Sequence, residues 1–227
     1  MSYVAVVPAA GAGRRMGTDI PKQYLKIHGK AVIDWTLRTL LSHPDIESVV
    51  VALGADDEYW PDTLSASDSR VRTVDGGKER CHSVLNALDM LVKEMSPGDY
   101  VLVHDAARPC VRGEDISRLI RLAGTGVGGV LGVPVHDTMK RTDAEGKVVE
   151  TVDRNRLWHA FTPQFFPLGL LRDSMKAALA AGVEITDEAS AMEWAGYCPL
   201  MVEGAASNIK ITRPDDLSLA AFYLAGV

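Results

Sequence analysis

VVPAAGAGRRMG occupies residues 6–17, and PKQYL follows at residues 21–25. An apolar strand leads into this loop of small residues, which carries Arg14 and Arg15 and is followed by Lys22. Small side chains let a backbone approach a ligand closely. Successive amide groups in such a loop form a concavity suited to phosphate oxygens. The loop and its cations predict a polyphosphate site, for a nucleoside triphosphate that is attacked at its α-phosphorus.

Strand and helix patterns alternate along the chain. Two continuous apolar runs, SVVVAL and YVLVH, are typical of strands buried on both faces. The alternation predicts an α/β fold, with a doubly wound, mostly parallel sheet and helices on both faces. The predicted strands cover residues 4–7, 48–53, 71–74, 100–104 and 127–135, and the predicted helices cover residues 31–42, 79–95, 115–123 and 214–225.

Three segments rich in Gly, Ser and charged residues follow predicted strands directly. They cover residues 8–17, 76–83 and 105–108. In doubly wound sheets, ligands bind beyond the carboxyl ends of the strands. We therefore expect these segments to meet at one edge of the sheet.

The alternation breaks at residues 136–153, HDTMKRTDAEGKVVETVD. Polar and β-branched residues alternate there around a plausible turn at residues 144–146, which predicts a β-hairpin arm. An isolated polar hairpin is only marginally stable in water, so we expect the arm to pack on a second subunit. The sequence has no linker long enough to separate two domains. It predicts one domain over residues 1–227, with a dimerisation arm at about 136–153.

Composition excludes several classes of function. The net charge of −6 gives the surface no nucleic-acid footprint. Cys81, Cys110 and Cys198 show no CxxC pair and no zinc spacing, so we expect reduced thiols. The amino terminus does not read as a signal peptide, and no apolar run approaches membrane-spanning length. We expect a cytoplasmic protein with no membrane or nucleic-acid partner.

Other phosphate-binding motifs fit the first loop poorly. Gly11, Gly13 and Gly17 are spaced one residue too widely for a dinucleotide fingerprint, and no G-K-[ST] follows. A solvated basic loop is the alternative interpretation of the cations.

Further motifs carry a family resemblance. The chain resembles the 2-C-methyl-D-erythritol 4-phosphate cytidylyltransferases over nearly its whole length, with the motifs in the same order. Beside the first loop and PKQYL these are DGGKER (75–80), VHDAARP (103–109), DTMKR (137–141), TVDRNRLW (151–158), TPQFF (162–166), TDEASA (186–191) and NIKITRPDD (208–216).

The resemblance implies a Rossmann-like nucleotidyltransferase, homodimeric through its arm. Such an enzyme moves a cytidylyl group from CTP to methylerythritol phosphate, a sugar-alcohol phosphate, and releases diphosphate. This step belongs to non-mevalonate isoprenoid precursor synthesis. The implied cofactor is Mg²⁺ or another divalent cation, bound mainly through the CTP phosphates. The chemistry also fits the residues, because an acceptor phosphate is already an anion and needs only charge stabilisation and alignment.

The resemblance also implies how CTP is held. Arg15 and Lys22 would stabilise charge around the α-phosphate and the leaving diphosphate, with Arg14 as a helper. Asp105 would orient the ribose or hold water around magnesium, although a helix N-cap is an equal alternative for it. The remaining nucleotide-binding residues line the backbone loop or read the pyrimidine, and they are Pro8, Ala9, Ala10, Gly11, Ala12, Gly13, Gly76, Gly77, Arg80, Ser83 and Ala106. From sequence alone, without the resemblance, a simple turn is the favoured interpretation of Gly76 and Gly77.

Acceptor binding is implied for a second set of residues, which are Arg108, Thr138, Arg154, Thr162, Thr186 and Lys210. Arg154 and Lys210 would also act in catalysis, and Arg154 and Thr138 would reach the partner's site. Two alternatives stay open. Thr186 fits a structural helix cap, and Lys210 fits an outward lysine on a strand between Ile209 and Ile211.

Rival functions also stay open. A ribitol-5-phosphate cytidylyltransferase would share the nucleotide half, and a sugar-1-phosphate guanylyl- or uridylyltransferase would share the first loop. A non-catalytic nucleotide-sensing protein is the alternative from another class.

Overall fold

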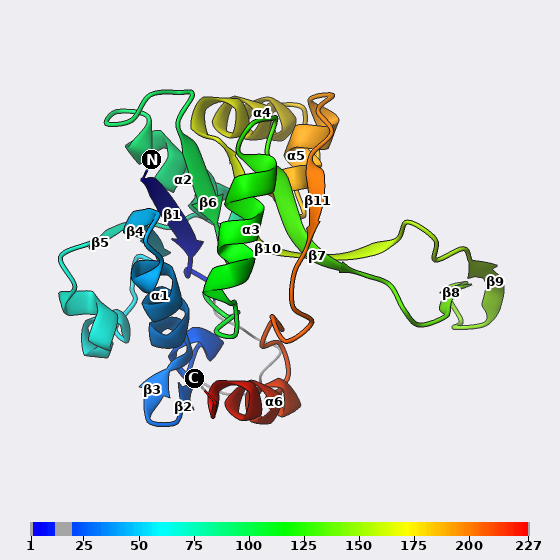
Figure 1. Cartoon of the computed structure of the whole chain (residues 1–227), viewed down its shortest axis with the longest axis horizontal. Helices are drawn as coiled ribbons and strands as arrows, with labels where there is room; N and C mark the ends of the chain where they lie inside the picture. The colour runs from blue at the N-terminus through cyan, green and yellow to red at the C-terminus, as the bar shows by residue number, and fades with distance from the viewer. Residues whose placement is uncertain (1, 12–19, 227) are drawn as a thin grey trace.

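The computed structural model describes residues 2–11 and 20–226. Within these residues a seven-stranded sheet has the order β11-β7-β10-β6-β1-β4-β5 (Figure 1). Its strands are β1 (Tyr3–Pro8), β4 (Ile46–Leu53), β5 (Val71–Asp75), β6 (Tyr100–Val103), β7 (Gly129–Pro134), β10 (Trp158–Pro167) and β11 (Leu200–Glu203).

The sheet is mostly parallel, as predicted. β1 pairs in parallel with β4 and β6, β4 with β5, and β11 with β7. β10 is the exception, because it runs antiparallel to both β6 and β7. The apolar runs of β1 and β4 lie inside the sheet, each with a neighbouring strand on both sides, and their residues are largely buried.

Two helical layers cover the sheet. The helices are α1 (Val32–Ser42), α2 (Arg80–Leu91), α3 (Gly113–Ala123), α4 (Leu168–Ala180), α5 (Glu188–Trp194) and α6 (Pro214–Leu224). α1 and α3 pack against Ala5 and Val7 of β1, in front of the sheet in Figure 1. α2, α4 and α5 pack with Val4 and Val6 on the opposite face. Alternate side chains of one strand therefore serve two cores.

Smaller elements complete the fold. α6 packs in a third cluster with Val32 and Trp35 of α1. The short strands are β2 (Lys26–Ile27), β3 (Lys30–Ala31), β8 (Met139–Thr142) and β9 (Val148–Val152), and single 3-10 turns cover Lys22–Tyr24, Trp60–Asp62 and Leu64–Ser67.

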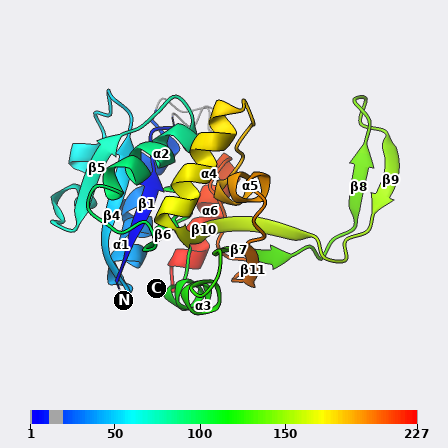
Figure 2. The same cartoon turned by 90° about the horizontal axis from the view of Figure 1, so that it is seen from above.

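β8 and β9 form the predicted hairpin arm, which stands away from the body of the molecule in both views (Figure 1, Figure 2). Gly146 closes its turn with φ +81°, and the Asp143 carboxylate accepts hydrogen bonds from two amides of the turn. Val148 and Val149 remain 61% and 64% exposed. The chain thus leaves apolar surface uncovered on its arm.

Two predictions of local structure are wrong. The helix predicted over residues 79–95 ends at Leu91, and the chain continues through turns to β6. Residues around Lys210 form no strand. The Ile211 amide donates one hydrogen bond to the Ala107 carbonyl, but no ladder of such bonds forms there. The predicted alternation of side-chain direction is confirmed, because Ile211 is buried and the neighbouring Lys210 is partly exposed on the other side of the segment. No helix within the described ranges is long and apolar enough to cross a membrane.

Candidate active site

A cavity of about 420 Å³ opens at the carboxyl edge of the parallel strands. The three segments expected to meet there do meet, as far as the structure describes them. The lining residues come from the ends of β1 and β6, the start of α2, the turn after β1 and the 208–212 segment, and they are Pro8, Ala9, Ala10, Gly11, Lys22, Gln23, Gly77, Lys78, Glu79, Arg80, Ser83, Asp105, Ala106, Ala107, Lys210 and Thr212.

Gln23 holds the first loop in place. Its buried amide Nε2 donates to the carbonyl oxygens of Ala9 at 2.6 Å and Gly11 at 3.1 Å. Lys22, its neighbour, donates from Nζ to the carbonyl of Ile211 at 2.8 Å. Gln23 is not among the predicted site residues, although it lies inside the PKQYL motif. Four predicted residues, Ala12, Gly13, Arg14 and Arg15, lie outside the described residues.

The loop before α2 packs directly on the loop after β1. A Cβ on Gly76 would lie 2.4 Å from Ala10 Cβ and 2.8 Å from the Leu53 carbonyl oxygen, so only glycine fits without a shift. Ser83 Oγ accepts from the Gly77 amide at 3.0 Å and donates to the Glu79 carbonyl at 3.2 Å. The Ser83 hydroxyl therefore braces this loop as well as lining the cavity.

Asp105 is the centre of a charge cluster. Its Oδ1 accepts from Arg80 Nε at 2.8 Å, and its Oδ2 faces Lys210 Nζ at 2.8 Å and Arg108 Nε at 3.3 Å. Burial alone would raise the pKa of Asp105, but the three cations hold that pKa well below its usual range. Asp105 thus remains a carboxylate that fixes three positive side chains.

Glu188 balances the cluster from the other side. Its Oε1 and Oε2 accept from the two Nη atoms of Arg80 at 2.7 and 3.0 Å, and Glu188 is fully buried. The cluster holds three cations (Arg80, Arg108 and Lys210) and two carboxylates (Asp105 and Glu188). Its net charge is therefore one positive, which suits an anionic ligand. Sequence reasoning did not identify Glu188. Its only signal was the TDEASA motif.

A hydrogen-bond chain stands behind Asp105. Thr162 Oγ1 accepts from the Asp105 amide at 3.0 Å and lies 3.0 Å from His104 Nδ1. His104 Nε2 lies 3.1 Å from the Arg108 carbonyl, which can only accept, so Nε2 carries the proton and Nδ1 accepts from Thr162. Burial lowers the pKa of His104 to about 4, so the imidazole is neutral.

Arg108 is also fixed behind the cavity. Its Nη1 donates to the Asn208 carbonyl at 2.8 Å, and its guanidinium lies 4.9 Å from the centre of the Phe161 ring. Asn208 Nδ2 donates in turn to the Thr162 carbonyl at 2.8 Å. Thr162 and Arg108, both predicted to contact the acceptor, thus do not line the cavity but hold its charged wall in position.

The other predicted acceptor residues lie apart from the cavity in this chain. Thr138 is exposed at the root of the arm, and the exposed Arg154 donates from Nη1 to the His136 carbonyl. Thr186 is exposed just before α5. The helix cap suspected at Thr186 belongs to Asp187, which accepts from the Ser190 amide at 2.9 Å.

Comparisons with known proteins point to one family. The family model described as 2-C-methyl-D-erythritol 4-phosphate cytidylyltransferase matches residues 3–226. A relative of that name from Vibrio vulnificus is 55% identical over 224 residues, which cover 98% of this chain and 94% of the relative.

Solved structures agree as well. The chain matches the crystal structure of the Francisella tularensis 2-C-methyl-D-erythritol 4-phosphate cytidylyltransferase with a TM-score of 0.86 and 36% identity, over 98% of this chain and all of that chain. The Thermus thermophilus enzyme of the same name matches at 0.82 and 32%, over the full length of both chains. The chain belongs to the 2-C-methyl-D-erythritol 4-phosphate cytidylyltransferase family.

Proposed function

We propose that this protein transfers the cytidylyl group of CTP to the phosphate of 2-C-methyl-D-erythritol 4-phosphate and releases diphosphate. The step belongs to isoprenoid precursor synthesis by the non-mevalonate route. One observation carries the proposal: Lys22, the 8–11 loop and three members of the charge cluster (Arg80, Asp105 and Lys210) line one cavity at the sheet edge. Membership of the family supports the choice of nucleotide and acceptor.

The reaction forms one bond and breaks one. An oxygen of the acceptor phosphate attacks the α-phosphorus of CTP, and the bond from that phosphorus to the bridging oxygen of diphosphate breaks. No protein nucleophile is needed, so the side chains serve to align two anions and to neutralise their charge. The positive excess of the Arg80, Lys210 and Arg108 cluster fits this task.

The nucleotide is proposed to lie along the 8–13 loop. Lys22 exchanges its Ile211 carbonyl for a phosphate oxygen and, with Arg15 and Arg14, stabilises the leaving diphosphate. The pyrimidine is read at Gly76, Gly77 and Ser83, where the absence of a Cβ on Gly76 allows two loops to touch. Asp105, beside Ala106 and Arg80, orients the ribose.

Magnesium fits this site through phosphate oxygens and water. Both oxygens of Asp105 already face cations, so the carboxylate suits an outer-sphere contact through water better than a direct bond. A hard octahedral ion with few protein ligands is usual where phosphates are present. When bound, the ion neutralises charge on the CTP phosphates.

The acceptor is proposed to bind where Lys210 faces the cavity, on the wall that Arg108 and Thr162 hold in position from behind. Thr186, which lies outside the cavity in this chain, is proposed to contact the acceptor only when it is bound. Thr138 and Arg154 complete the site from a second copy of the chain. Their place at the root of the arm supports this, as do the exposed Val148 and Val149 on the arm itself. The working protein is thus proposed to be a homodimer of one-domain chains. Three free cysteines support a reducing, cytoplasmic setting.

Diphosphate release tests the function. Purified protein is incubated with CTP and Mg²⁺, and with either methylerythritol phosphate or ribitol 5-phosphate. We expect rapid release with the first acceptor and background release with the second. The reverse order would overturn the choice of acceptor. CTP binding without release on either acceptor would identify a nucleotide sensor instead.

A further inference from the structure

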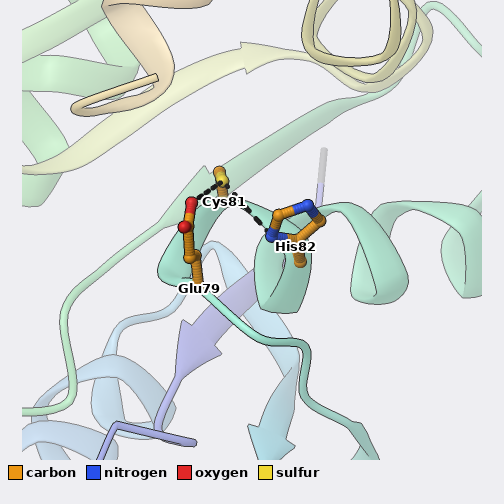
Figure 3. A group of neighbouring side chains, drawn as sticks. All are labelled: Glu79, Cys81 and His82. Atoms are coloured by element: carbon orange, nitrogen blue, oxygen red, sulfur yellow. Dashed lines mark hydrogen bonds between the residues drawn. The ribbon is translucent and has the colours of Figure 1, made fainter. Parts of the chain in front are cut away.

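Three different donor side chains meet at the start of α2. Cys81 Sγ lies 3.8 Å from Glu79 Oε2 and 3.7 Å from His82 Nδ1. Figure 3 shows the three side chains together at the start of the helix. All three donor atoms lie within 4.8 Å of one another. Cys81 is buried, His82 is half-buried and Glu79 is exposed, so the group lies where the core meets solvent. The proposed transfer reaction gives no role to Cys81 or His82.

The spacing of the three atoms fits a tetrahedral metal ion. Zinc lies about 2.3 Å from thiolate sulfur and about 2.0–2.2 Å from imidazole nitrogen or carboxylate oxygen. A regular tetrahedron with those bonds has sulfur–nitrogen and sulfur–oxygen edges of about 3.6 Å. The two sulfur separations, 3.8 and 3.7 Å, exceed that by only a few tenths of an ångström. The carboxylate oxygen and the imidazole nitrogen lie within 4.8 Å of each other, and rotation of the exposed Glu79 side chain can bring them to the tetrahedral edge of about 3.4 Å.

The backbone explains how adjacent residues can share an ion. Glu79 is the extended N-cap residue of α2, with φ −130° and ψ 169°, while Cys81 and His82 belong to the first helical turn. The Glu79 carboxylate lies beside Cys81 Sγ, as the dashed line in Figure 3 marks. From sequence, the EXCH order matches no familiar zinc spacing, and no zinc was expected. The missing signal was the extended backbone of Glu79 just before the helix.

The donor set selects a different ion from magnesium. Thiolate and imidazole favour zinc and similar transition metals, whereas magnesium prefers oxygen ligands. We propose that Glu79, Cys81 and His82 bind one zinc-like divalent cation, with its fourth position open to water. Because Glu79 also lines the cavity, the ion lies at the edge of the nucleotide site. This site does not depend on the proposed transfer reaction.

Metal binding by the metal-free protein tests the site directly. Zinc affinity is measured by competition with a chromophoric chelator, and cobalt is added separately to detect a sulfur-to-cobalt charge-transfer band. We expect one tight ion per chain and a clear band. The matched control is Cys198→Ser, because Cys198 is an exposed cysteine outside the group. It should retain both signals.

Cys81→Ser should abolish the cobalt band, and Cys81→Ser, His82→Ala and Glu79→Gln should each weaken zinc binding by about tenfold or more. Glu79→Gln changes an exposed side chain, so it keeps the test valid even if replacement of the buried Cys81 impairs folding. Wild-type zinc affinity in all three variants would overturn the site. Failure of the wild-type protein to bind zinc above an adventitious background would also overturn it.

Discussion

Asp105 is a buried carboxylate whose charge is maintained by its neighbours. Arg80, Arg108 and Lys210 each face one of its oxygens within 3.3 Å. Removing the negative charge would leave three cations close together in a desolvated wall. The same contact that shapes the proposed site thus contributes to the stability of the folded chain.

This coupling predicts a specific pH dependence. Because the pKa of Asp105 is lower in the folded than in the unfolded chain, its stabilisation is complete above the unfolded value of about 3.9. This stabilisation is lost as the pH falls from about 3.9 through the pKa of Asp105 in the folded chain. We expect the unfolding free energy of wild type to approach that of Asp105→Asn as the pH falls from about 5 to about 2.

Urea denaturation of both proteins across this range measures the effect. Wild type and Asp105→Asn share all other carboxylates. The difference between their unfolding free energies at each pH therefore isolates the contribution of Asp105. A difference that stays constant with pH would contradict the assignment.

Thr162 offers a second residue-scale test. Its hydroxyl joins the Asp105 amide to His104 Nδ1, and both partners are buried. Thr162→Val keeps the shape but leaves these two groups without their partner, which costs about 1–3 kcal/mol. Thr162→Ser retains the hydroxyl and should lose much less stability. Urea unfolding measures both variants, and equal losses would contradict the hydrogen-bond chain.

At the scale of elements, the site depends on how closely two loops approach. Gly76 lies against Ala10 and the Leu53 carbonyl, where an added Cβ would be 2.4 and 2.8 Å from its neighbours. Gly76→Ala must push the loop before α2 away from the loop after β1, at a cost of about 1–3 kcal/mol. We therefore expect weaker CTP binding by calorimetry.

Gly98→Ala provides the matched control. Gly98 lies in a loop with open space around the added Cβ, so the variant should bind CTP as wild type does. Equal CTP affinity in Gly76→Ala and wild type would show that the close approach is not needed for nucleotide binding.

Sequence reasoning succeeded for elements whose burial is uniform. β1, β4 and β6 are continuous apolar runs and were predicted within two residues of their observed ends. β10 was missed because its first half is partly exposed while its second half is buried, and Pro163 interrupts the pattern. The Asp105 cluster was only partly predictable, since its contacts join residues 25 and 108 positions apart along the chain. The local sequence pattern predicts that these residues lie at the edge of the sheet. It does not predict which of them form ion pairs with one another.

At the scale of the whole molecule, the projecting arm raises the question of where the site is completed. A hairpin of this size is marginal alone, and its valines are exposed in the single chain. Lys22 lines the cavity, whereas Arg154 lies at the root of the arm on the outside. If both serve one reaction, the simplest arrangement is that each site takes Lys22 from one chain and Arg154 from its partner.

Mixing two inactive variants tests this arrangement. In the proposed dimer, Lys22→Ala and Arg154→Ala each lack one required cation in every site, so each should release diphosphate slowly. A heterodimer of the two contains one site with both cations and one site with neither. After subunit exchange, half of the dimers are mixed, so about a quarter of wild-type activity should return. If Arg154 serves the cavity of its own chain, every site in the mixture lacks one cation and the activity stays at the level of the single variants.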